Sequence, residues 1–187
     1  LFNEILTNFY ESDYDMNVRI CRYHNVYGPF GTWDGGREKA PAALCRKIIN
    51  AKLTRDHRIG VWGDGEQTRS FMYIDDCITG MDKIWESGYS KPINLGSSEM
   101  VSINQLIDMI EDIAGIKVER EYDLTKPQGV RGRNSDNTLI KEKVGWEPSV
   151  SLKDGLEKTY AWIYEQIKAG NQDVSLNYSQ EGNSCAV

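Results

Sequence analysis

The sequence contains few of the residues that build metal sites and disulfide frameworks. Its 187 residues include two histidines and four cysteines, and no two cysteines have a Cys-x-x-Cys spacing. Zinc sites depend on such paired spacings, and small disulfide-bonded folds carry more cysteines in a shorter chain. We therefore expect no metal site. We interpret four residues as free, buried thiols, namely Cys21, Cys45, Cys77 and Cys185.

Two further absences exclude broad classes of partner. No segment approaches the roughly 20 consecutive apolar residues of a membrane-spanning helix, and no basic stretch followed by an apolar one indicates a signal peptide. A formal net charge of -6 does not suit a protein that binds nucleic acid, which would present a basic face. We expect a cytoplasmic protein with neither a membrane nor a nucleic-acid partner.

Positive charge is nevertheless concentrated at two places along this acidic chain. Local groups of cations suit a small anionic ligand. They consist of Arg37, Lys39, Arg46 and Lys47 in one stretch, and Arg131 and Arg133 in another.

Strand-type and helix-type patterns alternate along the chain, which predicts an α/β fold. Leu1–Tyr10 has apolar residues on one face and no capping residue before it, so we expect the chain to begin inside a helix. Ser102 and Gln105 have the spacing of a capping box. Predicted strands are 17–23, 58–62, 71–74, 92–95 and 117–122; predicted helices begin near residues 1, 41, 75, 102, 139 and 151, the third with Asp75 or Asp76 as its cap.

The segment RYHNVYGP, Arg22–Pro29, is the first that carries chemistry. It lies where a predicted strand turns into a loop, and ligands of open α/β sheets bind beyond the carboxyl ends of strands. Asn25 and Tyr27 are therefore placed to contact a ligand. An asparagine that caps the turn with its side chain explains Asn25 equally well.

Four segments in order resemble the sugar-nucleotide members of the extended short-chain dehydrogenase/reductase family. They are RYHNVYGP, GDGEQTRSFMYIDD, PINLGSSEMVSI and VGWEPSVSLKDGLEKTYAW. Two more, Phe30–Lys47 and Gln128–Pro148, narrow the resemblance to the family's GDP-mannose epimerases. The resemblance implies the C-terminal part of such a protein, with the last elements of a Rossmann parallel sheet (1–28 and 71–100), a small mixed α/β substrate-binding lobe (29–70 and 101–178), and a loose tail (179–187).

The resemblance also implies a reaction. NAD takes a hydride from C4 of the sugar of GDP-mannose or a related nucleotide sugar, and the resulting ketone acidifies C3 and C5, so that an acid and a base on opposite faces give GDP-L-galactose. Lys39 corresponds to the family's acid; the alternative is a lysine that neutralises phosphate or faces solvent. The implied setting is a cytoplasmic homodimer in nucleotide-sugar metabolism, with a part in ascorbate biosynthesis.

Other residues follow from matched motifs. Arginine meets phosphate with planar, bidentate donors, although an isolated arginine is usually a solvated surface charge. In the resembled family the substrate contacts correspond to Asn25, Glu38, Lys39, Ala40, Lys47, Gln67, Thr68, Arg69 and Arg133, and Tyr23, His24 and Asn25 reach the cofactor.

Three family features are missing from the sequence: a glycine-rich dinucleotide fingerprint, an acidic residue about 20 positions later, and a Tyr-x-x-x-Lys pair. The family's base is a cysteine in the absent half, and none of the cysteines here matches its motif, Cys45 included. We therefore predict that the chain alone is inactive. The alternatives are a nucleotide-sugar dehydratase or decarboxylase, and a non-catalytic nucleotide-sugar-binding module.

Overall fold

The computed structural model describes residues 2–127 and 129–170 and divides into two compact units. The first unit comprises Leu1–Val26, Ser70–Met100 and Arg133–Val150. The second comprises Tyr27–Arg69, Val101–Gly132 and the chain from Ser151 onward. The predicted division differs at residues 133–150, which were grouped with the substrate-binding lobe. The predicted loose tail lies outside the described residues.

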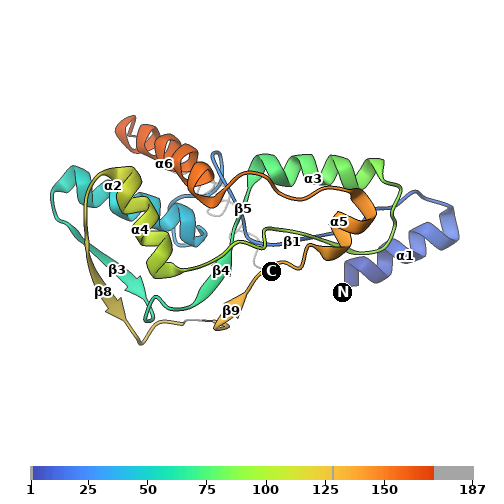
Figure 1. The fold of residues 1–187 in the computed structure, drawn as a ribbon, viewed down its shortest axis with the longest axis horizontal. Coiled ribbons are helices and arrows are strands. Elements are labelled where there is room, and N and C mark those ends of the chain that lie inside the picture. Colours follow the sequence, from blue (N-terminus) through green and yellow to red (C-terminus); the bar gives the residue numbers. More distant parts are fainter. Residues whose placement is uncertain (1, 128, 171–187) are drawn as a thin grey trace, which may run out of the picture. The chain divides into compact units, whose positions relative to one another are not determined.

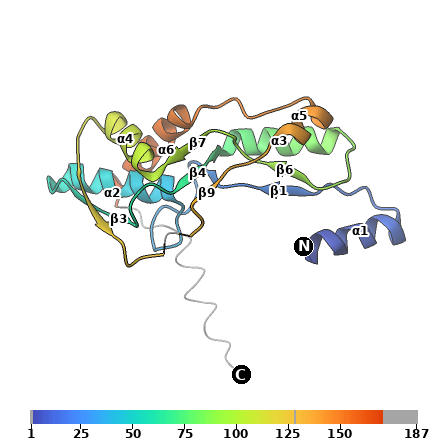
Figure 2. The same cartoon turned by 60° about the horizontal axis from the view of Figure 1, so that its bottom comes forward.

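The first unit is built on a short parallel strand pair covered by helices. Strand β1 (Cys21–Tyr23) pairs with β6 (Ile93–Leu95) in parallel. Helices α3 (Ile74–Glu86) and α5 (Thr138–Val144) pack on β6 and on each other (Figure 2). Because Ile140 of α5 is buried in this core, residues 133–150 belong to the first unit. The core consists of Met72, Cys77, Ile84, Ile93, Leu95 and Ile140, with Trp146 against it.

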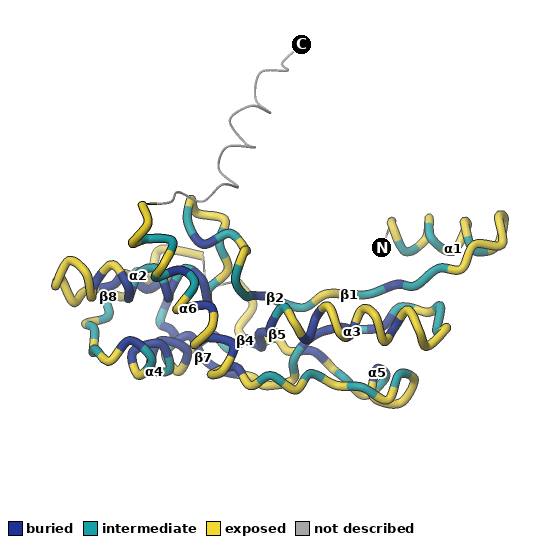
Figure 3. Tube along the Cα trace, turned by 90° about the horizontal axis from the view of Figure 1, so that it is seen from above, coloured by how far each residue is buried: buried dark blue, intermediate teal, exposed yellow. Residues whose placement is uncertain are grey.

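Helix α1 (Phe2–Tyr14) forms where the apolar periodicity predicts it, but none of its residues is buried (Figure 3). The expected strand at 17–23 is shorter than predicted. Only Cys21–Tyr23 joins the ladder, because its partner β6 offers three residues.

The second unit combines a parallel pair of strands with three helices, one of which packs against the pair (Figure 1). Strand β3 (Arg58–Trp62) lies beside β8 (Glu119–Asp123) in register from Arg58 opposite Glu119 to Trp62 opposite Asp123. The helices α2 (Ala40–Thr54), α4 (Ile103–Ala114) and α6 (Leu152–Lys168) contact one another. Their fully buried side chains include Ile48, Ile49, Leu106, Ile107, Ile110, Leu152 and Leu156.

Local sequence signals set both ends of α4. The Ser102–Gln105 capping box is formed, and α4 ends at Gly115 in the left-handed conformation. The expected Asp75 or Asp76 cap of α3 is wrong, because Tyr73 is the N-cap. The carboxylate of Asp76 instead accepts from the backbone N–H groups of Ser149 at 3.0 Å and Val150 at 2.8 Å.

The remaining strands are short. Strand β2 (Val26–Tyr27) pairs with β5 (Met72–Tyr73), and a three-stranded sheet has the order β7-β4-β9. These three strands are Met100–Ser102, Thr68–Ser70 and Gly132–Arg133. Of the strand predicted at 71–74 only the two residues of β5 form, because α3 begins at Ile74. Strand β9 lies in a stretch where no strand was predicted.

The described residues include no helix that combines the length and apolar character needed to cross a bilayer. Cys45 and Cys77 are buried thiols as predicted, and Cys21 is half-buried. Cys185 lies outside the described residues.

Gly80 tests the packing of the first unit. A Cβ at this position would meet Leu95 Cδ1 at 2.5 Å and the Trp146 ring at 2.7 Å. Overpacking of this kind costs roughly 1–3 kcal/mol, and the helix propensity gained by alanine returns at most about 1 kcal/mol. We expect Gly80→Ala to lower the urea-unfolding midpoint. Gly60→Ala, which meets nothing within 4 Å, is the matched control and should change it little.

Candidate functional site

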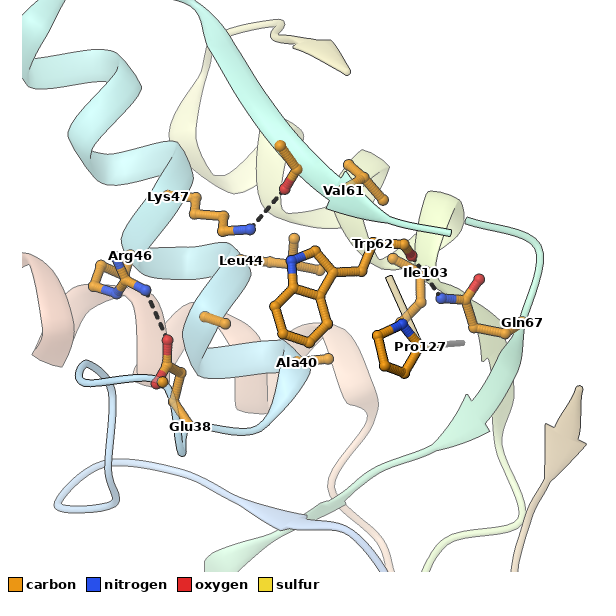
Figure 4. Close-up of a pocket in the computed structure, with 13 residues that line it drawn as sticks. Glu38, Ala40, Leu44, Arg46, Lys47, Val61, Trp62, Gln67, Ile103 and Pro127 are labelled. Carbon is orange, nitrogen blue, oxygen red and sulfur yellow. Dashed lines mark hydrogen bonds and ion pairs between the residues drawn. The ribbon is translucent and has the colours of Figure 1, made fainter. Parts of the chain in front are cut away.

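A cavity of about 490 Å³ opens in the second unit between the start of α2, strand β3 and the start of α4 (Figure 4). Its walls are mostly apolar, with a few polar groups, as expected of a ligand site. Four residues predicted as substrate contacts line it, namely Glu38, Ala40, Lys47 and Gln67; the other lining residues are Gly36, Ala43, Leu44, Arg46, Gly60, Val61, Trp62, Ile103 and Pro127.

Strand β3 supplies an aromatic wall through its alternation. Ile59 and Val61 are buried, whereas Arg58, Gly60 and Trp62 face outward. Trp62 is 57% exposed, and its indole lies beside α2 in the cavity (Figure 4). A large aromatic residue on the outward face of a half-buried strand marks this position, but the sequence analysis did not select it. Trp62 provides a flat apolar surface for a planar ligand group.

Lys47 is a partly buried cation in the cavity wall. Its Nζ donates to the Gly60 carbonyl at 2.6 Å. Burial lowers the pKa of Lys47, the positive charge of Arg46 lowers it further, and the carboxylate of Glu38 opposes both. An ammonium has three donors, so this group can bind an anion while it keeps its bond to β3.

Gln67 is held in place by its neighbours. Its side-chain Nε2 donates to the Trp62 backbone carbonyl at 3.0 Å, and the backbone carbonyl of Gln67 accepts from the Ile103 N–H at 3.2 Å. The preceding turn is fixed against α4, because a Cβ on Gly65 (φ +75°) would meet the Asn104 side chain at 2.3 Å. The motif therefore supplies a rigid amide to the cavity, and among the residues that the structure describes the buried Gln67 Oε1 has no hydrogen-bond partner.

Thr68 and Arg69 follow Gln67 but do not line the cavity. The Thr68 N–H donates to the Arg131 carbonyl at 2.9 Å, and Arg69 Nη1 donates to the Thr68 carbonyl at 2.6 Å. No strand was predicted at Arg69 or Arg133. They lie instead in strands β4 and β9, which are too short to give a periodic sequence signal.

Lys39 is exposed and does not line the cavity, although its neighbours Glu38 and Ala40 do. Its backbone is extended (φ -76°, ψ 158°) as the N-cap of α2, and its carbonyl accepts from the Ala43 N–H at 3.0 Å. The structure thus fixes the backbone of Lys39 and leaves its ammonium in solvent.

Glu38 is committed to an ion pair. Its Oε1 lies 2.7 Å from Arg46 Nη2, and its side chain is only 6% exposed. Burial would raise the pKa of Glu38, but hydrogen bonds from the backbone and Arg46 hold it below its usual value. The carboxylate therefore stays ionised and paired.

The predicted site residues of the first unit are mostly bonded within it. Asn25 has φ +48° and donates from Nδ2 to the Ser70 carbonyl at 3.0 Å, so it joins two segments instead of capping its own turn. His24 Nδ1 lies 3.2 Å from Ser70 Oγ. Tyr23 and Arg133 are exposed.

Cys45 is unsuited to acid–base chemistry. It is fully buried in α2, and burial raises the pKa of its thiol well above the ordinary value. No catalytic role was predicted for Cys45 from the sequence.

Known proteins resemble most of this chain. A profile of the family described as GDP-mannose 4,6 dehydratase matches residues 1–159. GDP-mannose 3,5-epimerase of Arabidopsis thaliana is 51% identical over 94% of this chain and 46% of its own length, and GDP-mannose 3,5-epimerase 1 of Oryza sativa subsp. indica is 51% identical over 90% and 43%. The chain spans about half the length of the curated relatives it matches.

Solved structures agree with this likeness. UDP-glucose 4-epimerase of Thermotoga maritima with UDP-glucose has a TM-score of 0.78 at 30% identity, over 88% of this chain and 51% of the other. UDP-glucuronic acid 4-epimerase of Bacillus cereus with NAD has a TM-score of 0.72 at 30% identity, over 90% and 50%. The fold is therefore that of the C-terminal part of an extended short-chain dehydrogenase/reductase, an α/β protein.

The environment of Lys47 gives a direct test. Glu38 raises the pKa of Lys47 while burial and Arg46 lower it. We expect NMR titration of the lysine Cε–H resonances to show Lys47 titrating below the usual lysine pKa. Glu38→Gln should lower that pKa further. As a control, Asp56→Asn removes a carboxylate paired with Arg58 and should leave the pKa of Lys47 unchanged. An ordinary lysine pKa for Lys47 in the parent chain would contradict the burial described here.

Proposed function

This chain belongs to the family described as GDP-mannose 4,6 dehydratase, and on that premise we propose that it is the substrate-binding half of an NAD-dependent GDP-mannose 3,5-epimerase. The complete protein would convert GDP-mannose to GDP-L-galactose. The observation that carries the proposal is the second-unit cavity, which gathers Glu38, Ala40, Lys47 and Gln67 from two separate matched motifs. The two plant epimerases at 51% identity support it.

The nucleotide would bind first through its base and diphosphate. A planar guanine gains stacking energy on an aromatic face, and Trp62 offers such a face in an apolar cavity. The Lys47 ammonium provides a cation in the same wall, where reduced solvation strengthens its attraction for phosphate. Arg69 and Arg133 are the further phosphate contacts that we propose from the matched motifs.

The sugar chemistry assigned to this chain is proton donation by Lys39. An ammonium on a fixed helix N-cap can deliver a proton to an enolate carbon at C3 or C5. The backbone bond from Ala43 to Lys39 keeps the position of the α-carbon constant, so that only the flexible side chain must find the substrate. The opposing base lies outside the matched motifs of this chain.

We propose NAD as the cofactor of the complete protein. It would reversibly oxidise C4 of the sugar. The solved epimerase from Bacillus cereus with NAD supports this. His24 and Asn25 make hydrogen bonds to Ser70, and only Tyr23 at the end of β1 presents an exposed side chain. These three residues supply the edge of a cofactor site, and the dinucleotide needs other residues to hold it.

Two further features belong to the proposal. We infer a cytoplasmic enzyme of nucleotide-sugar metabolism with a part in ascorbate biosynthesis, and a homodimer in its complete form. The apolar face of α1, with Phe2 75% and Phe9 57% exposed, supports burial of this helix in a larger assembly.

A dehydratase is the second candidate, because the matching family profile carries that description. A dehydratase would eliminate water from the sugar. An epimerase would leave the composition of the sugar unchanged and invert C3 and C5, whose hydrogens exchange with solvent. The product alone separates the two.

The reaction is tested with GDP-mannose in deuterated water. We expect the complete protein to place deuterium at C3 and C5 of the recovered nucleotide sugar, as read by NMR, and the 187-residue chain alone to leave GDP-mannose unchanged. Loss of water from the sugar, with or without deuterium at C5, would establish the dehydratase. Conversion of GDP-mannose by the 187-residue chain alone would refute the proposal that this chain supplies only the substrate-binding half.

Trp62 tests the binding part. Stacking of one base on an aromatic side chain is worth roughly 1–3 kcal/mol, so Trp62→Ala should weaken GDP binding about 5- to 150-fold by calorimetry. Trp62→Phe should retain most of the affinity. Trp85→Ala removes an exposed tryptophan of the first unit and serves as the control. Equal GDP affinity in the parent chain and Trp62→Ala would place the base elsewhere.

A further inference from the structure

The segment that leads into Lys39 is flexible by composition. It runs from Trp33 to Glu38 and contains Gly35 at φ +87° and Gly36 at φ +83°. Glycine adopts this left-handed backbone without strain but gains no rigidity from it. A residue that must present a proton at one position needs this segment to be fastened by other contacts.

One guanidinium supplies these contacts. Arg46 lies nearly two turns into α2, and helical side chains tilt toward the N-terminus of their helix. Its Nε donates to the Trp33 carbonyl at 3.0 Å and lies 3.2 Å from Asp34 Oδ1. Its Nη2 donates to Glu38 Oε1 at 2.7 Å. Arg46 therefore holds both ends of the glycine segment.

Burial makes the attachment strong. The Glu38 side chain is 6% exposed and that of Arg46 is 21% exposed, so solvent screens this pair less than a surface pair. Trp33 is also buried, at 6% exposure. Removing Arg46 would leave the Glu38 carboxylate buried without its ionic partner, a strongly unfavourable state that the segment relieves by moving.

We infer that Arg46 is a positioning residue for Lys39. Lys39 is fixed on one side by the helix, through the Ala43 N–H, and on the other by Glu38, which is held by Arg46. The inference rests on the proposed function, because the position of Lys39 matters only if it delivers the proton. Arg46 also lines the cavity, so direct contact with the nucleotide is the competing role to be tested.

Steady-state kinetics of the complete protein separate the two roles. A shift of about 1 Å at a reacting group can cost on the order of 100-fold in rate. We expect Arg46→Met to lower kcat by about 10- to 100-fold and to change KM by less than about 2-fold, because substrate binding is retained. Arg58→Met removes a solvent-exposed arginine paired with Asp56 and should leave kcat and KM unchanged.

Deuterium exchange gives a second measurement, which would not change if Arg46 had a purely structural role. With the acid misplaced, the opposing base still removes and returns a proton on its own face, which exchanges the hydrogen without inverting the carbon. The ratio of exchange to epimer formation should therefore rise in Lys39→Met and in Arg46→Met. The double variant should lose no more than Lys39→Met alone, because both changes disable the same group.

Each outcome has one meaning. If Lys39→Met leaves the ratio and kcat unchanged, the proposed acid is wrong. If Lys39→Met shows the expected pattern but Arg46→Met raises KM with an unchanged ratio, or the two effects multiply, Arg46 is not a positioning residue. If Arg46→Met lowers the melting temperature below the assay range, Arg46→Lys replaces it; a single ammonium cannot hold both ends of the segment, so the ratio should still rise.

Discussion

The burial of helix α2 is the constraint on which the second unit depends. One face of this helix contributes Leu44, Cys45, Ile48 and Ile49, all nearly or fully inaccessible to solvent, to contacts with α4 and α6. Packing of this density leaves the helix little freedom to rotate or slide. The adjoining face, which carries Lys47 and Arg46, is consequently fixed toward β3 and the glycine segment. The core of the unit thus sets the position of the cations.

Charge is distributed to match this geometry. The chain is acidic overall, with a net charge of -6, yet the cavity wall holds Lys47 and the Arg46–Glu38 pair. In the pair, Glu38 neutralises the charge of Arg46, and the two side chains form part of the cavity wall. Lys47, in contrast, keeps its charge in a partly desolvated setting. A structural and a ligand-binding role are therefore divided between adjacent residues of α2, and Lys39 at the helix N-cap remains available in solvent.

Sequence patterns predicted the regular elements well where the signal was local. Strand β3 has the predicted bounds, and the Ser102–Gln105 capping box is formed as expected. Interactions between residues distant in sequence were not predictable in this way. Asp76 was expected to cap α3, but it bonds to Ser149 and Val150, more than 70 residues away. Strands β4 and β9 have too few residues to show a period, so no strand was predicted at Arg69 or Arg133.

The same limit applies to the site. Matched motifs led to Glu38, Lys47 and Gln67, which line the cavity, but gave no reason to select Trp62 or to connect Arg46 with Trp33. Those roles arise from the register of β3 and the reach of an arginine along α2, which are properties of the folded chain.

The central claim is that the cavity of the second unit is the nucleotide-binding site. A crystal structure of the chain with GDP-mannose tests it most directly. We expect the guanine to lie beside the Trp62 indole and a phosphate oxygen to lie within hydrogen-bond distance of Lys47 Nζ. A nucleotide bound elsewhere on the chain, with the cavity empty, would contradict it.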